Sequence, residues 1–259
     1  MGAHGRRFLA CLIGCLLGAC VRTSPVVIPS APATFTVLTW NMHGGRGDLA
    51  RLIDDLEAGR ISGSPATDYV LLLQEFVDRG DDAVDRTRIR KLTLFVSPVR
   101  SAMGNAIVSS IGLEEPRTID LPRERQPRGA VIATIRVAGE TLFVGSTHLE
   151  NRLGLIQGLF GDRARGRQAA ALVEALPTGH GVIGGDFNTM LGPDEPAWRA
   201  LIARFPDTPA KPEPTFRDRL VLDHLFFDLP DGWKVIRRVV SDRYGSDHHP
   251  VVASVLAPS

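Results

Sequence analysis

The chain has 259 residues, of which 44% are apolar and 23% are charged, and its formal net charge is +1. This composition is ordinary for a soluble globular protein, and the length suits one large domain or two small ones. The near-neutral charge gives no global positive field for binding nucleic acid, although a local basic groove remains open.

The N-terminal segment is predicted to be a targeting signal rather than part of the fold. Arg6 and Arg7 precede the apolar run FLACLIGCLLGA, at residues 8–19. A run of about a dozen residues is too short to span a bilayer and suits the core of a signal peptide. The run ends in LLGAC, which resembles the bacterial lipobox, so we expect residues 1–19 to be a lipoprotein signal peptide and Cys20 to be lipidated. An ordinary secretory signal cleaved nearby is the alternative.

The cysteines favour the lipid anchor. All three cysteines of the chain lie at or before Cys20, so the rest of the chain has no disulfide, no thiol nucleophile and no cysteine-bound metal. Residues 20–33 are rich in Pro, Ser and Ala and are predicted to be a flexible tether. We expect a protein that is attached by lipid to a membrane of the bacterial cell envelope. Val21, where an Asp would favour the inner membrane, favours the outer one.

Residues 34–259 are predicted to form one continuous domain, because no second linker or repeat interrupts them. Short runs rich in Val, Ile, Leu, Phe and Thr predict strands at 35–41, 69–75, 92–97, 105–110, 130–137, 141–148, 181–188, 222–228, 233–240 and 250–256. Helical spacing of apolar residues predicts helices at 47–59, 81–92, 162–177 and 195–205. So many strands with a few helices favour an α+β fold of two packed sheets with helices outside.

Polar side chains stand where several of these strands begin or end. Burying such groups without partners would cost several kcal/mol apiece, so we expect them to converge on one site at one rim of the sheets. These residues are Asn41, Glu75, His148, Asp186, Asn188, Asp223, Asp247 and His248.

The residue types indicate the chemistry. Asn, Glu and Asp supply hard oxygen ligands, which suit Mg²⁺ and also Mn²⁺ or Ca²⁺. Histidines beside aspartates suit proton transfer or the charge of a phosphoryl transition state, so the set favours metal-assisted hydrolysis of a phosphate ester. The G-x-S-x-G, H-E-x-x-H and P-loop motifs are absent from the sequence. A zinc hydrolase using His148, His248 and His249 stays open, although neighbouring residues of an extended chain point to opposite faces.

The motifs TWN, LLQE, GNAIVSS, STHLEN, GGDFN, LDHLFF and SDHHP follow one another along the chain. In this order the sequence resembles the endonuclease/exonuclease/phosphatase superfamily, which has the deoxyribonuclease I-like fold. The resemblance implies a four-layer α/β/β/α sandwich, with two packed mixed sheets flanked by helices, as the catalytic domain at 34–259.

The resemblance also implies roles for single residues. Glu75 is the principal metal ligand, with Asn41 beside it and Asp247 near enough to help. Asp186 orients or deprotonates the attacking water, and Asn188 hydrogen-bonds the phosphate or the attacking oxygen.

Two histidines are implied to face the phosphate. His248 acts as an imidazolium or as part of a pair with Asp223, and His148 is a candidate general acid. The choice of general base stays open between Asp186 and the His248 pair.

Two further residues are expected to bind substrate. Arg128 precedes the strand at 130–137, where the family often has a basic residue, and arginine matches phosphate bidentately. A solvated surface arginine is the alternative. Asn105 stands in GNAIVSS, although Gly-Asn is also favourable turn chemistry. The basic start of the helix at 162–177, with Arg163, Arg165 and Arg167, is either an anion contact or a solvated helix face.

The sequence thus predicts a monomeric, divalent-metal-dependent phosphoesterase of the phosphodiesterase or endonuclease kind. Its partners would be a phosphate ester such as DNA, RNA or a phospholipid head group, and a membrane through the lipid anchor. A phosphatase or phospholipase C-like enzyme acting on a lipid or inositol phosphate is the alternative. A catalytically silent binding module is disfavoured because Glu75, Asp186 and His248 are all present.

Overall fold

The computed structural model describes residues 34–77, 92–96, 104–151, 161–190, 192–207 and 213–258. The predicted signal peptide and tether, at 1–33, lie outside this range, and so does nearly all of the helix predicted at 81–92. In the part that is described, no helix has the length and apolar character needed to cross a bilayer.

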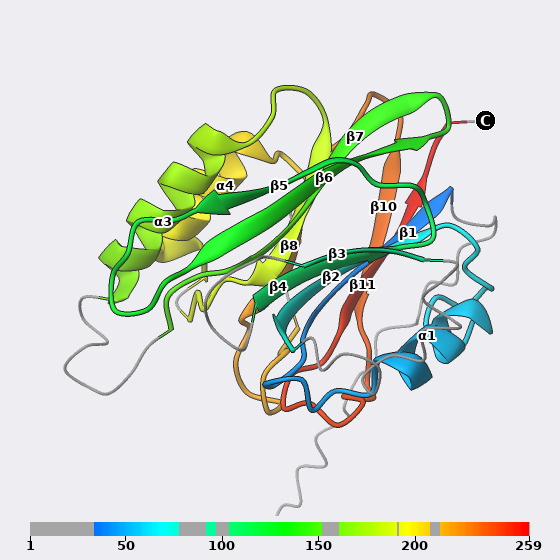
Figure 1. Ribbon diagram of the computed structural model, residues 1–259, viewed down its shortest axis with the longest axis horizontal. Coiled ribbons are helices and arrows are strands. Elements are labelled where there is room, and N and C mark those ends of the chain that lie inside the picture. Colours follow the sequence, from blue (N-terminus) through cyan, green and yellow to red (C-terminus); the bar gives the residue numbers. More distant parts are fainter. Residues whose placement is uncertain are drawn as a thin grey trace, which may run out of the picture.

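Two mixed sheets form the centre of the domain (Figure 1). The first has the order β10 (Lys234–Val239), β11 (Val251–Leu256), β1 (Phe35–Asn41), β2 (Tyr69–Phe76), β4 (Gly104–Ser109) and β3 (Thr93–Val96). The second has the order β5 (Glu114–Asp120), β6 (Gly129–Val137), β7 (Glu140–His148), β8 (Gly181–Asp186) and β9 (Asp223–Asp228). Each sheet contains one parallel pair, β1 with β2 and β7 with β8, and the other neighbours are antiparallel.

Helices cover the outer faces of both sheets. Figure 1 shows α3 (Gly161–Ala175) and α4 (Pro196–Arg204) together on one side of the molecule, with α1 (Leu49–Glu57) on the other. The side chain of Asp48 caps α1 by accepting a hydrogen bond from the backbone N–H of Arg51, at 3.0 Å. A proline at the first helical position begins α4, as its fixed φ favours.

Three apolar cores separate the four layers. Along β1, Phe35 and Val37 pack between the sheets, whereas Leu38 and Trp40 pack against the layer of α1. A third core joins the outer face of the second sheet to α3 and α4. Because the central strands are buried on both faces, their sequences are almost continuously apolar. The predicted four-layer α/β/β/α sandwich is confirmed.

One strand was not predicted. β5, with the sequence EEPRTID, lies at the edge of the second sheet and is largely exposed, so it lacks the apolar alternation that reveals a half-buried strand. Its pairing with β6 is also irregular between Glu114 and Arg117. Elsewhere strand ends differ from prediction by one or two residues; the strand predicted at 181–188 ends at Asp186.

Candidate active site

The predicted site residues lie at one end of the two sheets. The parallel strands β1 and β2, and β7 and β8, finish at this end, whereas β4, β6, β9 and β11 run the other way and begin there. Strand direction therefore brings together residues that follow some strands and residues that precede or open others. They are Asn41, Glu75, Asn105, Arg128, His148, Asp186, Asn188, Asp223, Asp247 and His248.

The turn at 246–248 is fastened to the end of β1. The side chain of Ser246 donates to the carbonyl of Asn41 at 2.7 Å and accepts from the backbone N–H of His248 at 3.0 Å. The indole N–H of Trp40 donates to the carbonyl of His248 at 3.2 Å. Sequence reasoning missed Trp40 and Ser246, because a tryptophan in a strand looks like core and a serine before Asp looks like loop.

Asp186 lies at the centre of the site and joins the two sheets. Its Oδ2 accepts a hydrogen bond from the Asn41 amide at 3.0 Å, and its Oδ1 accepts from the backbone N–H of Asn188 at 3.1 Å. The Nε2 atoms of His148 and His248 lie 3.4 Å and 3.9 Å from Oδ2. Burial, and next the negative charge of Asp223, raise the pKa of Asp186 to about 7, against the opposing effects of His248 and Asn41. This carboxyl group therefore changes protonation near neutral pH.

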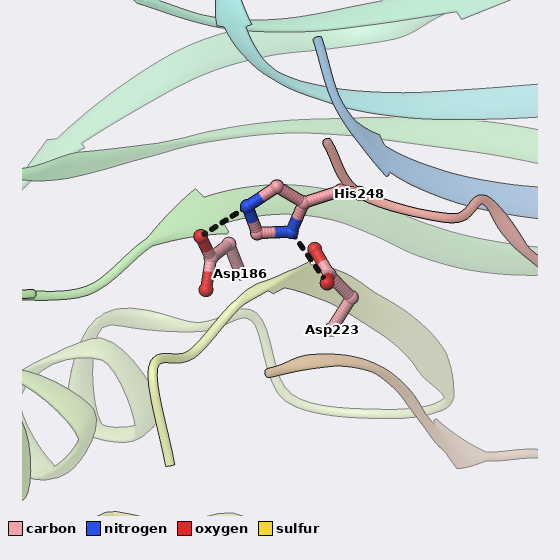
Figure 2. A group of neighbouring side chains, drawn as sticks. All are labelled: Asp186, Asp223 and His248. Atoms are coloured by element: carbon pink, nitrogen blue, oxygen red, sulfur yellow. Dashed lines mark hydrogen bonds and ion pairs between the residues drawn. The ribbon is translucent and has the colours of Figure 1, made fainter. Parts of the chain in front are cut away.

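His248 stands between two carboxylates, as Figure 2 shows. Its Nδ1 lies 2.8 Å from Asp223 Oδ2, and its Nε2 faces Asp186. Burial lowers the pKa of His248, but the charge and hydrogen bond of Asp223, with the charges of Asp186 and Asp247, outweigh it and raise the pKa to about 9. At neutral pH His248 is therefore an imidazolium.

His148 is held in the opposite protonation state. Its ring is buried, and this burial, with the positive charges of Arg128 and His248, places the pKa of His148 well below its usual value. The neutral imidazole is a poor proton donor until an anion binds beside it. The two histidines therefore differ in charge although both face Asp186.

Glu75 owes its direction to a break in β2. Leu73 pairs with Ala106 and Phe76 with Gly104, so β2 carries one extra residue between these pairs, which is a β-bulge. Glu75 has a φ of 51°, in the left-handed region that non-glycine residues rarely adopt. Its Oε2 accepts a hydrogen bond from the backbone N–H of Gly44 at 2.8 Å. A strained backbone that turns a carboxylate toward a polar site is typical of functional positions.

Asn188 is also strained, with a φ of 54°. One N–H of its amide donates to the carbonyl of Leu149 at 3.2 Å, which fixes the side chain beside Asp186. The amide has a second N–H that can serve a ligand.

A family model described as the endonuclease/exonuclease/phosphatase family matches residues 38–248. The chain belongs to this family. The match covers every predicted site residue except Cys20. A search of curated proteins finds no match.

Solved structures of the family share the fold at low sequence identity. The catalytic domain of human Nocturnin, solved with bound sulfate, has a TM-score of 0.65 and 16% identity, over 87% of this chain and 99% of that one. The 3'-5' exonuclease NExo from Neisseria meningitidis has a TM-score of 0.62 and 18% identity, over 86% and 100%. Truncated TDP2 from Caenorhabditis elegans has a TM-score of 0.56 and 22% identity, over 86% and 97%.

Enzymes of the endonuclease/exonuclease/phosphatase family use divalent metal ions, and the predicted ligands here share one turn. The backbone N–H of His43 donates to Asn41 Oδ1 at 3.0 Å, next to the contact between Gly44 and Glu75. The His43 ring also lies 3.4 Å from Asp247 Oδ1. The turn at 41–44 thus holds three oxygen-bearing side chains, and hard oxygens are the ligands that fit Mg²⁺.

A second group in the described residues has metal-ligand spacing. The ligand atoms of Asp186, Asp223 and His248 all lie within 4.8 Å of one another. Asp223 Oδ1 is buried and has no hydrogen-bond partner in the described part of the chain. His248, however, would have to lose its proton to bind a metal, because its pKa is raised to about 9. We therefore favour the oxygen set around Glu75 for the cation.

Arg128 and Asn105 meet where β6 begins. Arg128 is close enough to Glu150, Asp186 and Glu75 for their charges to oppose the lowering of its pKa by burial. Its Nε is buried and donates to none of the described residues. The Asn105 amide donates to the carbonyl of Gly129 at 2.7 Å, so it braces the residue after Arg128, and its contact with substrate stays a prediction.

Two other histidines have partners away from the site. The ring nitrogens of His249 lie 2.8 Å from the Val240 carbonyl and 2.7 Å from Asp218, so His249 does not join the zinc trio considered above. His224 packs edge-on against Trp198.

At the basic start of α3, Arg163 and Arg167 are exposed, as expected for a solvated helix face, whereas Arg165 fits neither of the two alternatives considered above. Arg165 is buried and ion-paired with Glu195 at 2.8 Å, and Arg167 pairs with Glu124 at 2.7 Å.

Proposed function

We propose that this protein is a divalent-metal-dependent phosphodiesterase that activates water with Asp186. Membership of the family supports phosphoesterase activity in general. The observation that carries the finer proposal is the geometry of two neighbouring groups: Asp186, held by Asn41 and the N–H of Asn188, faces the Nε2 of His248, whose Nδ1 is held by Asp223. The raised pKa values, about 7 for Asp186 and about 9 for His248, agree with it. A base and an acid that coexist near neutral pH are what general acid–base catalysis requires.

The base is Asp186 rather than His248. His248 already carries a proton at neutral pH, because Asp223 stabilises the imidazolium. Asp186 is ionised in a substantial fraction of molecules at pH 7 and can take a proton from an attacking water. Asn41 and the backbone N–H of Asn188 hold its two oxygens in a fixed orientation.

The remaining groups bind the phosphate. The imidazolium of His248 stabilises negative charge on the phosphoryl oxygens and is the group with a proton for the leaving oxygen. His148 donates a hydrogen bond as a neutral ring, and the free N–H of Asn188 donates another. Arg128 supplies positive charge from the β6 side, next to Asp186 and Glu75.

A divalent cation would be held by Glu75, with Asn41 and Asp247 beside it. When bound, such an ion, Mg²⁺ by preference and Mn²⁺ or Ca²⁺ otherwise, would supply Lewis-acid polarisation of a phosphoryl oxygen and offset its charge. Asp247 is already engaged by Arg217 at 3.1 Å and by His43 at 3.4 Å, which favours Glu75 as the principal ligand.

The test is hydrolysis by the purified protein of supercoiled plasmid, bis(4-nitrophenyl) phosphate, phospholipids and inositol phosphates in Mg²⁺, with EDTA and Asp186→Ala controls. Cleavage that needs both the metal and Asp186 supports the proposal. Activity restricted to phospholipids or inositol phosphates would replace it with the phospholipase C-like or phosphatase alternative. A folded protein inert on all of them would refute enzymatic activity.

We also propose that the enzyme is anchored to the cell envelope through Cys20. The support is the sequence LLGAC after a basic and apolar leader, with no cysteine after Cys20. Metabolic labelling with radioactive palmitate in a bacterial host tests this proposal. Label on the wild-type protein and none on Cys20→Ser is expected, and equal labelling of both would exclude the anchor.

A further inference from the structure

Two buried side chains, Gln168 and Glu150, fix the segment that carries Arg128. Gln168, on α3, accepts from the backbone N–H of Glu150 at 2.8 Å and donates to the carbonyl of Pro122 at 3.1 Å. Glu150 Oε2 accepts from the backbone N–H groups of Arg125 and Gln126, at 3.0 Å and 3.2 Å. One carboxylate and one amide therefore fix the segment that leads into β6, and neither takes part in the proposed reaction.

Holding this segment with the carboxylate of Glu150 carries a high desolvation cost. The residue is only 2% exposed, and its Oε1 is buried with no hydrogen-bond partner among the described residues. Burying a carboxylate costs several kcal/mol unless it is fully paired, and a neutral amide could accept the same two backbone hydrogen bonds at lower cost. A negative charge at this position therefore needs a further reason.

Arg128 supplies that reason. Glu150 Oε2 holds the backbone N–H groups of Arg125 and Gln126, just before Arg128, and the negative charge of Glu150 favours the Arg128 cation more than Asp186 or Glu75 does. The buried Nε of Arg128 has no partner in the described part of the chain, so hydrogen bonds alone do not hold the group. Without Glu150, a cation at this depth would be drawn into direct ion pairs with the carboxylates that the reaction uses.

We propose that Glu150 is a positioning residue, which fixes the segment before β6 and balances the charge of Arg128 so that the guanidinium stays available to the phosphate of the substrate. This inference rests on the proposed function only in naming phosphate as the group that Arg128 binds. Glu150 is buried and its Oε2 is engaged by the backbone N–H groups of Arg125 and Gln126, so it acts through this segment rather than on the reacting atoms.

The experiment compares full-length wild type, Glu150→Gln, Arg128→Ala and the double variant. Binding of inorganic phosphate is measured by calorimetry, and KM and kcat are measured on bis(4-nitrophenyl) phosphate. Glu150→Gln should weaken phosphate binding and raise KM by about tenfold, with kcat changed less, as expected for a lost charge-assisted contact. In the Arg128→Ala background the same substitution should have little further effect, since coupled residues are not additive.

The matched control is Glu114→Gln, which removes an exposed carboxylate paired with Arg136 on the same sheet. It should change neither phosphate binding nor KM. If Glu150→Gln fails to fold, Glu150→Asp keeps the charge but withdraws the oxygen from the backbone N–H groups, and it should also weaken phosphate binding. Wild-type phosphate affinity in whichever Glu150 variants fold, or an equal loss with and without Arg128, would overturn the inference.

The same data separate this inference from the proposed function. Phosphate binding that depends on Glu150 in a protein that hydrolyses nothing would sustain the inference and refute the function. Hydrolysis that is indifferent to Glu150 would do the reverse.

Discussion

Two groups of buried charges differ in what they do. Between α3 and α4, Arg165 and Glu195 are 1% and 0% exposed and form an ion pair at 2.8 Å. One cation meets one anion there, so the charges cancel locally. At the strand ends, one imidazole faces the two carboxylates of Asp223 and Asp186, at 2.8 Å and 3.9 Å.

At the strand ends two buried carboxylates share one imidazole, and this unequal number of charges shifts the pKa values of the groups. Burial, and next the charge of Asp223, raise the pKa of Asp186, while the charges of both carboxylates raise the pKa of His248 against its burial. Groups whose protonation changes near neutral pH can move protons during a reaction. Matched burial of charge thus serves the fold, and unmatched burial serves chemistry.

Replacing Asp186 by Asn should give the largest effect on activity. Loss of the base should lower kcat by roughly 10²- to 10⁴-fold. The free energy of unfolding should not fall. Folding raises the pKa of Asp186 from 3.8 to about 7, so between these pH values the unfolded chain loses the proton first. The stability of the wild type therefore declines as pH rises through this range, and the substitution removes that loss. Kinetics and thermal unfolding at pH 8 check this, and a variant much less stable than wild type would show that Asp186 is structural.

Replacing Arg165 by Met should lower the stability of the protein and leave its activity unchanged. Removing one partner of a buried ion pair leaves an uncompensated charge and should cost about 3–5 kcal/mol of unfolding free energy. The kcat of the folded fraction should stay at the wild-type value, because the pair lies apart from the site residues. Urea unfolding measures the loss of stability, and kcat per folded molecule measures whether activity is unchanged.

The double variant Arg165→Met with Glu195→Leu sharpens the same point. Removing both charges should restore most of the lost stability. Loss of kcat in this double variant would mean that the two groups of charges are not independent.

Replacing Asp223 by Asn should shift the pH profile without abolishing activity. In the wild type, kcat should rise as Asp186 ionises near pH 7 and fall as His248 loses its proton near pH 9. Asp223 raises both pKa values, so the variant should move both limbs to lower pH. A profile in which only the alkaline limb moves would show that Asp223 acts on His248 alone.

The sequence predicts much of this site because each functional residue is a polar exception beside an apolar run. Asn41, His148 and Asp186 each close a strand directly after a run of buried residues, and a shared polar site lets such groups be buried with partners. Parallel pairing places His148 beside Asp186 at the end of one sheet, and the packing of the two sheets brings Asn41 from the other sheet to Asp186.

What the sequence does not predict depends on contacts between distant segments. The run YVLLLQEF gives no sign of the bulge that turns Glu75 toward Gly44, because the bulge is defined by the pairing of β2 with β4. Glu150 looks like an ordinary solvated residue after a strand, and its burial is visible only once α3 and the segment before β6 are in place. The pKa of Asp186 likewise depends on Asp223, which the pairing of β8 with β9 sets opposite it.

The smallest expected effect separates exposed from buried charge. Arg136 and Glu114 form an ion pair on the exposed face of β5 and β6, with side chains 70% and 48% exposed. Water screens such a pair and already solvates each partner alone, so Glu114→Gln should leave the unfolding midpoint and kcat within experimental error. Measurement at low and high salt makes the test stricter, because a real contribution would shrink as salt rises. A clear, salt-sensitive loss of stability would mean that the energetic contribution of an ion pair in this protein depends on more than its burial. The contrast between Arg165 and Asp186 would then have to be explained by the local geometry of each group.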